Sequence, residues 1–199
     1  MRLERVPLAD LPDLSLLRDV EELFLTRTPL TDLAPLAGLH RLRVLGLRLT
    51  RVVDLSPLAG LTALESLNVA FTPVADVSPL AGLTGLRSLY LTGTLVADIA
   101  PLAALTALER LDLGGTRVAD LAVLRGMKRM ISLQVTDTPV TDLTPLAGLQ
   151  ELRVLEAGNT RVTDIAPVRA LPSLRFVDMR GVGGPFPTHW VMRGARRRR

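Results

Sequence analysis

The stretch from residue 61 to residue 82 reads LTALESLNVAFTPVADVSPLAG, and the chain repeats this 22-residue pattern along most of its length. The repeat is easiest to follow through one threonine, which recurs every 22 residues: Thr28, Thr50, Thr72, Thr94, Thr116, Thr138 and Thr160. An aspartate follows each of these threonines after four residues, and in six of the seven copies a proline follows after three more. Self-similarity at a fixed period is the signature of a repeat protein, so we expect the chain to coil as a solenoid.

Each unit carries apolar residues whose spacing changes along the unit. Leu61, Leu64 and Leu67 are three residues apart, whereas Leu67 and Val69 are two apart, as on one face of a β-strand. We therefore expect a short strand at 66–70, then a turn, then a short helical segment near 78–82. About eight such turns are visible in the sequence. Stacked about 4.8 Å apart, they would bury their leucines against one another.

The pattern Leu61-x-x-Leu64-x-x-Leu67-x-Val69-x-x-Thr72 resembles a leucine-rich repeat. The 22-residue length and the Asp-x-x-Pro-Leu segment make it most similar to the bacterial internalin-like class, over roughly residues 1–182. The resemblance implies an α/β fold: a right-handed solenoid of about eight turns, with a parallel β-sheet on the concave side and 3₁₀ or short helical turns on the convex side. Threonine stands where that class usually has asparagine. Internalins are exported and anchored at the cell surface, and their adhesive role is not carried over to this chain.

A solenoid exposes its core at both ends, so we expect a cap at each end of the repeats. Residues 1–20 are interpreted as an N-terminal capping turn, because charged residues interrupt their apolar positions, and residues 21–182 as leucine-rich repeats. Residues 183–192 contain Phe186 and Trp190 and are predicted to form a C-terminal cap over the last turn. Residues 193–199 are interpreted as a basic, disordered tail.

The formal net charge of +4 comes from that tail, since residues 1–192 carry 19 basic and 20 acidic side chains. Its five arginines are Arg193, Arg196, Arg197, Arg198 and Arg199. They suggest an alternative function, in which the protein is an adaptor that contacts nucleic acid or an anionic membrane. No apolar run is long enough to span a membrane, and the first residues do not read as a secretory signal. The sequence therefore predicts a cytoplasmic protein. The resemblance to the internalin-like class and the bias of 23 arginines to one lysine indicate a bacterial one.

The composition disfavours several kinds of chemistry. With 48% hydrophobic residues the chain is too apolar for intrinsic disorder, and without cysteine it has no thiolate metal site, disulfide or cysteine nucleophile. No phosphate loop, nucleophile elbow or dinucleotide fingerprint appears. We therefore predict a non-enzymatic protein with no metal and no cofactor. The best acid–base alternative pairs Asp112 with Glu156, two turns and about 10 Å apart with Gln134 between them.

The threonine and aspartate columns are interpreted as structural. A threonine hydroxyl at the turn after a strand can bond to backbone groups. The Asp76 carboxylate can accept the backbone N–H two residues on, with Ser78 as the N-cap of a short helix and Pro79 as its first residue. Calcium binding along the aspartates is the alternative.

The six aromatic residues point to a binding surface, because none of them occupies a core column. Phe24, Phe71, Tyr90 and Phe176 fall at outward positions, where aromatic side chains are typical of binding hot spots. We predict that another protein binds the concave face, although exposed aromatics without a partner remain an alternative. The predicted binding residues are Phe24, Val44, Arg48, Leu49, Asn68, Phe71, Tyr90, Asp112, Asp137 and Glu156.

Overall fold

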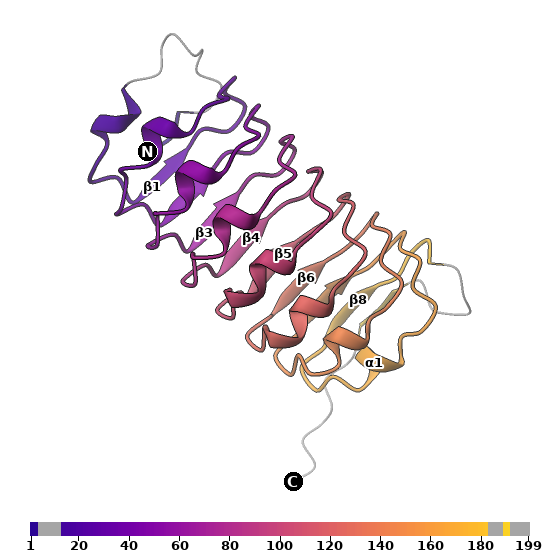
Figure 1. The fold of residues 1–199 in the computed structure, drawn as a ribbon. Coiled ribbons are helices and arrows are strands. Elements are labelled where there is room, and N and C mark those ends of the chain that lie inside the picture. The colour runs from indigo at the N-terminus through magenta and orange to yellow at the C-terminus, as the bar shows by residue number, and fades with distance from the viewer. Residues whose placement is uncertain (4–12, 183–188, 192–199) are drawn as a thin grey trace.

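The computed structural model describes residues 1–3, 13–182 and 189–191, and it shows a solenoid built on one β-sheet (Figure 1). Eight strands pair in parallel and in the order of the sequence, which confirms the expected coil of about eight turns. They are β1 (Glu22–Phe24), β2 (Val44–Gly46), β3 (Ser66–Asn68), β4 (Ser88–Tyr90), β5 (Arg110–Asp112), β6 (Ser132–Gln134), β7 (Val154–Glu156) and β8 (Phe176–Asp178).

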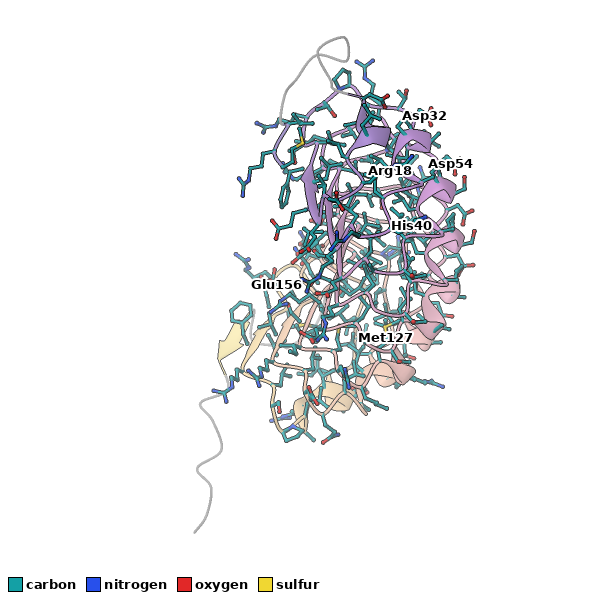
Figure 2. All side chains as sticks on the ribbon, turned by 90° about the vertical axis from the view of Figure 1, so that its left-hand side faces the viewer. Arg18, Asp32, His40, Asp54, Met127 and Glu156 are labelled. Carbon is teal, nitrogen blue, oxygen red and sulfur yellow. The ribbon has the colours of Figure 1, made fainter. Side chains whose placement is uncertain are left out.

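Short helices form the opposite side of the coil. The sheet lies on the inner side of a gentle curve and the helices on its outer side, as the positions of Glu156 and Asp54 in Figure 2 show. The 3₁₀ helices are η2 (Leu14–Leu16), η3 (Ala34–Leu36), η4 (Ser56–Leu58), η5 (Ser78–Leu80), η6 (Ala100–Ala104), η7 (Ala122–Gly126) and η8 (Thr144–Leu146), and a single α-helical turn follows as α1 (Ala166–Arg169). The expectation of 3₁₀ or short helical turns on this side is thus confirmed.

The sheet departs from the expected parallel arrangement at its end. A ninth strand, β9 (His189–Val191), pairs antiparallel with β8, so it closes the last turn as a returning strand. This strand falls inside the predicted C-terminal cap, whereas Phe186 and the basic tail from Arg193 onward lie outside the described residues. At the other end Arg2 forms a parallel bridge with Phe24, which covers the open edge of β1.

The apolar positions of the repeat form a continuous core. Leu67 and Val69 are completely buried, as their two-residue spacing predicted. Met127 and Met130, which replace leucines, are also completely buried. The strand covers only Ser66–Asn68 and is shorter than the predicted 66–70, because the chain enters a turn at residue 70. That turn includes Phe71, whose φ of +57° lies outside the range of a strand.

The threonine column is structural, as predicted. Thr72 donates its hydroxyl hydrogen to the carbonyl oxygen of Val69 over 2.6 Å, and each of the other six threonines does the same to the residue three positions earlier. All seven are buried. The hydroxyl therefore closes the turn that follows each strand. Its hydrogen-bonding requirement is met by the backbone carbonyl oxygen, although the group is buried away from water.

The aspartate column also has the predicted local role. Asp76 Oδ1 accepts the backbone N–H of Ser78 over 2.8 Å, and the other six aspartates accept the N–H two residues on in the same way. The prediction that Ser78 is the N-cap is wrong, because Ser78 begins η5 and donates its hydroxyl to Asp76 Oδ2 over 2.8 Å. These bonds favour the carboxylate and lower the pKa of Asp76.

Candidate binding surface

The strand register brings the predicted residues into rows across the concave face. Phe24, Gly46, Asn68 and Tyr90 follow one another across β1 to β4, and Val44 lies in the row beside them. Phe24, Val44, Asn68 and Tyr90 are half-buried. The outward side chains of β1 to β4 are therefore partly covered by neighbouring residues of the protein.

The most exposed predicted residues lie just after the strands rather than on them. Leu49 is 37% exposed and Phe71 is 45% exposed. They are adjacent in the stack, because the Leu49 N–H donates to Ala70 and the Phe71 N–H donates to Thr92 in the following turn. Arg48 is half-buried beside them. The apolar part of the predicted surface is thus centred on the rim where the strands end.

This rim has an unusual backbone. The third residue after each strand has a positive φ. These residues form a row across the eight turns: Arg27, Leu49, Phe71, Gly93, Gly115, Asp137, Asn159 and Gly181. Glycine, asparagine and aspartate adopt this conformation readily, whereas a bulky side chain there costs about 1–2 kcal/mol. The first three turns nevertheless carry large side chains. Strain of this kind is commonly retained at binding sites.

Two aromatic rings on the face are each held between an arginine and a glycine. The Arg48 guanidinium carbon lies 4.9 Å from the centroid of the Phe71 ring. On the other side, a β-carbon added to Gly93 would come within 2.6 Å of Phe71 Cδ1. Phe24 repeats the arrangement, with Arg2 at 5.1 Å and a β-carbon on Gly46 at 2.8 Å. The glycines therefore make room for rings that lean onto the next turn.

The sequence did not point to two further exposed apolar residues, which lie farther along the loops after the strands. Leu95 is 43% exposed and Val53 is 59% exposed, and both lie in loops that follow strands of the same half. Each departs from its own column of the repeat, since proline or arginine takes the Leu95 position in other turns and threonine or alanine takes that of Val53. A comparison of the repeats column by column is the signal that would have found them.

The acidic residues of the other half are engaged with their neighbours. Asp112 Oδ1 accepts the N–H of Gly114 over 2.9 Å, and the Gln134 side-chain amide, in the orientation that satisfies both groups, donates to Asp112 Oδ2 over 2.9 Å. Asp137 accepts from the Asn159 side-chain amide over 2.8 Å. These bonds give Asp112 and Asp137 structural roles in addition to the predicted binding role.

The two carboxylates of the acid–base alternative are separated by one strand, as the sequence predicted. Asp112 and Glu156 lie in the same row but on β5 and β7, with Gln134 on β6 between them.

Two other outward polar residues form local bonds. The Asn68 Oδ1 atom accepts the backbone N–H of Ala70 over 3.0 Å. Asp178, buried on β8, forms an ion pair with Arg180 at 2.6 Å, and this hydrogen bond raises the pKa of Arg180.

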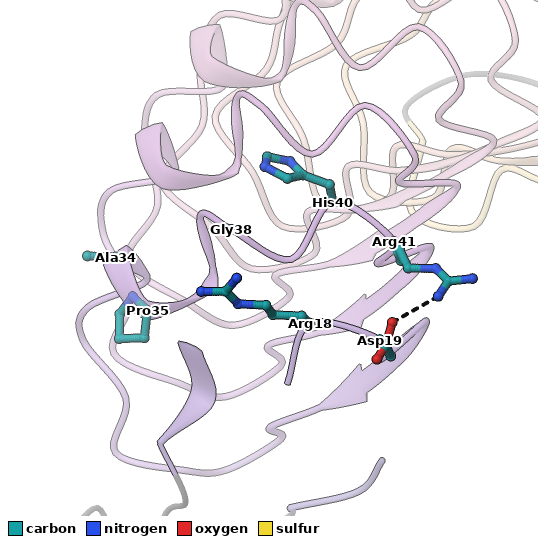
Figure 3. A pocket seen from close by; sticks show the side chains of 7 residues that line it. All are labelled: Arg18, Asp19, Ala34, Pro35, Gly38, His40 and Arg41. Carbon is teal, nitrogen blue, oxygen red and sulfur yellow. Dashed lines mark hydrogen bonds and ion pairs between the residues drawn. The ribbon is translucent and has the colours of Figure 1, made fainter. Parts of the chain in front are cut away.

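A pocket of about 610 Å³ lies beside the first two turns, away from the rows described above (Figure 3). It is lined by Arg18, Asp19, Ala34, Pro35, Gly38, His40 and Arg41. Arg41 Nη1 lies 2.9 Å from Asp19 Oδ1, and the charged groups are open to solvent.

Among the described residues, no three histidine, aspartate or glutamate side chains converge as metal ligands. No helix among them is long and apolar enough to cross a membrane.

Comparison with solved structures gives several matches of high similarity. An internalin (inlF) from Listeria monocytogenes is 36% identical with a TM-score of 0.81; the match covers 85% of this chain and 50% of that protein. An internalin C2 (inlC2) from the same species is 32% identical with a TM-score of 0.82, covering 83% and 74%. This chain thus spans about half the length of the first internalin. The plant peptide hormone receptor RGFR1 in complex with RGF2 is 18% identical with a TM-score of 0.74, covering 92% and 31%, and shares the fold. No protein-family model and no curated protein sequence matches.

Proposed function

Because the chain belongs to the internalin-like family of leucine-rich-repeat proteins, we propose that it is a non-enzymatic scaffold that binds another protein through its concave face. The observation that carries this proposal is the exposed apolar rim of turns two to four. Leu49, Phe71 and Leu95 are each at least one-third exposed there. Single exposed apolar residues are ordinary, but Leu49 and Phe71 occupy the same position on adjacent turns, and neighbouring exposed apolar side chains favour an interaction surface.

The strained backbone adds a second line of support. Leu49 and Phe71 keep large side chains at positions where later turns use glycine, aspartate or asparagine. Replacing them with glycine would relieve strain, so their presence suggests that the side chains serve a partner. The plant receptor in complex with RGF2 has the same fold, which supports a protein partner for a solenoid of this kind.

Capture of partners by the purified protein tests the proposal. The wild-type chain and the Phe71→Ala/Tyr90→Ala variant would be used to retain proteins from a lysate of the source organism, with quantitative mass spectrometry as the readout. Phe176→Ala is the matched control, since Phe176 is a half-buried aromatic on the same sheet at its far end. We expect the double variant to lose the partner and the control to keep it. Equal retention by all three proteins would remove the concave surface from consideration.

The alternative function of the tail and the cytoplasmic location stay predictions. The five arginines from Arg193 to Arg199 lie outside the described residues. If they act as an adaptor for nucleic acid or an anionic membrane, deletion of residues 193–199 should abolish retention on DNA or on anionic vesicles that is sensitive to salt. Cell fractionation tests the location.

A further inference from the structure

The further inference concerns the chemistry of the partner and rests on the proposed function. We infer that the N-terminal half of the concave face binds an acidic and apolar protein segment, in which carboxylates stand next to aliphatic or aromatic side chains. The residues that carry it are called the arginine–aromatic surface, and they are Arg27, Arg48, Leu49, Phe71 and Leu95.

Two cations of this surface face no carboxylate partner within the described residues. Arg27 and Arg48 make no ion pair there, whereas Arg43 pairs with Glu65 at 2.8 Å and Arg87 with Glu109 at 2.9 Å at the other end of the strands, one residue before each strand begins. The Arg27 backbone N–H donates to the Arg48 carbonyl oxygen over 2.9 Å, so the two residues lie in contact on neighbouring turns. Two arginines without an ion pair in the described part of the chain therefore stand on neighbouring turns of the rim that carries Leu49 and Phe71.

Arg48 is already prepared for a planar anion. Its guanidinium lies against the Phe71 ring, and the outer edge of a stacked guanidinium still presents N–H donors. A carboxylate can accept two of these donors at once. Because the ring already restrains the side chain, binding there loses less conformational entropy than binding by a free arginine.

The charge pattern of the whole face favours an acidic partner at this end. Glu22 is the one acidic residue in the outward strand rows of β1 to β4, and it acts on Arg43, whose pKa is raised chiefly by Glu65 and to a smaller extent by Glu22. In the same rows the other acidic residues are Asp112 on β5, Glu156 on β7 and Asp178 on β8. A basic segment would be drawn to that far half, whereas an acidic one is drawn to Arg27 and Arg48.

The dimensions set the length of the segment. Turns one to four span three strand spacings, or about 14 Å. An extended chain advances about 3.3 Å per residue, so about five residues bridge the surface. A carboxylate on Arg48 would then be followed by apolar side chains against Leu49, Phe71 and Leu95.

Selection from a displayed library of random 12-residue peptides tests this chemistry on the full chain. We expect the enriched peptides to carry aspartate or glutamate within a few positions of leucine, isoleucine, phenylalanine or tryptophan. The Kd of the best synthetic peptide, followed by fluorescence anisotropy, should rise about tenfold or more for Arg27→Gln/Arg48→Gln. Arg110→Gln is the matched control, because Arg110 is an exposed arginine on β5, and it should leave the Kd unchanged.

The outcomes separate this inference from the proposed function. Enriched peptides that are neutral or basic, yet lose binding to Phe71→Ala/Tyr90→Ala, overturn the acidic chemistry and support the concave surface. Acidic peptides that bind Arg27→Gln/Arg48→Gln as tightly as the wild type also overturn it. A library that yields no binder overturns the inference as well, while the capture experiment still decides the proposed function. Unchanged circular dichroism and melting of each variant show that the fold is intact.

Discussion

The ring of Phe71 rests on Gly93 of the next turn, and each residue restricts what the other can be. A β-carbon on Gly93 would lie 2.6 Å from Phe71 Cδ1, which is closer than van der Waals contact allows. Gly93 also has a φ of +65°, a conformation that favours glycine. The exposed aromatic residue and the glycine beside it therefore form one structural unit across two turns.

Replacement of this glycine measures the cost of disturbing the ring. Gly93→Ala should lower the free energy of unfolding by about 1–2 kcal/mol for the left-handed backbone, and by roughly 1 kcal/mol more because the ring must move. Gly115→Ala is the control, since Gly115 has the same φ but its added β-carbon meets the Gly93 backbone only at 3.7 Å. Urea unfolding of both variants gives the difference. Equal losses would show that the ring moves without cost.

Opposing effects meet at Leu49, so removal of its side chain should change stability little. Leu49→Gly relieves about 1–2 kcal/mol of left-handed strain, but it costs roughly 0.5–1 kcal/mol in unfolded-state entropy and about 1–2 kcal/mol for the covered part of the side chain, which is 37% exposed, so a small net loss is expected. Val53→Gly, at an exposed position without a positive φ, gains no relief of strain and should lose more stability. Urea midpoints compare the two variants, and a larger loss for Leu49→Gly would contradict the strain at Leu49. If the partner binds through this rim, Leu49→Gly should weaken binding with only a small change in the midpoint.

The buried hydroxyls should each contribute to stability. Thr116 donates to Leu113 over 2.6 Å, and Thr116→Val keeps the shape of the side chain but removes this hydrogen bond. We expect a loss of about 1 kcal/mol in the free energy of unfolding. Thr106→Val, at an exposed threonine, should change it little. A neutral Thr116→Val would contradict the structural role assigned to the threonine column.

The hydroxyl beside an aspartate should couple stability to pH. Ser56 lowers the pKa of Asp54 below its usual value of 3.8, through its hydroxyl first and its backbone N–H second. The resulting stability is present above the unfolded pKa and is lost as the pH falls through the lower folded pKa. Ser56→Ala should raise the Asp54 pKa in an NMR titration. It should lower the melting temperature at about pH 6 but not at about pH 2.

Thr62→Ala serves as the control for that titration, because Thr62 is exposed and far from Asp54 along its own turn. It should leave the Asp54 pKa and the pH dependence unchanged. An Asp54 pKa that stays the same in Ser56→Ala would show that the backbone N–H alone holds the carboxylate.

The coil, its period and the hydrogen bonds within each turn could be predicted from the repeat alone. Burial follows directly from the repeat, so Leu67 and Val69 were placed in the core and the Thr72 hydroxyl in a turn without knowledge of the structure. These features depend on contacts within a turn or between identical positions of adjacent turns. Knowing one turn, and that the next turn is a copy stacked beside it, is therefore enough to predict these contacts.

The arrangement of the outward side chains, by contrast, became visible only in the folded chain. The stack of Arg48, Phe71 and Gly93, the exposure of Leu95 and the engagement of Asp112 by Gln134 each join unlike residues from different turns. The repeat does not dictate these residues, and their arrangement depends on side-chain directions and on the left-handed residue after each strand. The antiparallel β9 likewise lies outside the repeat, so no periodic signal could place it.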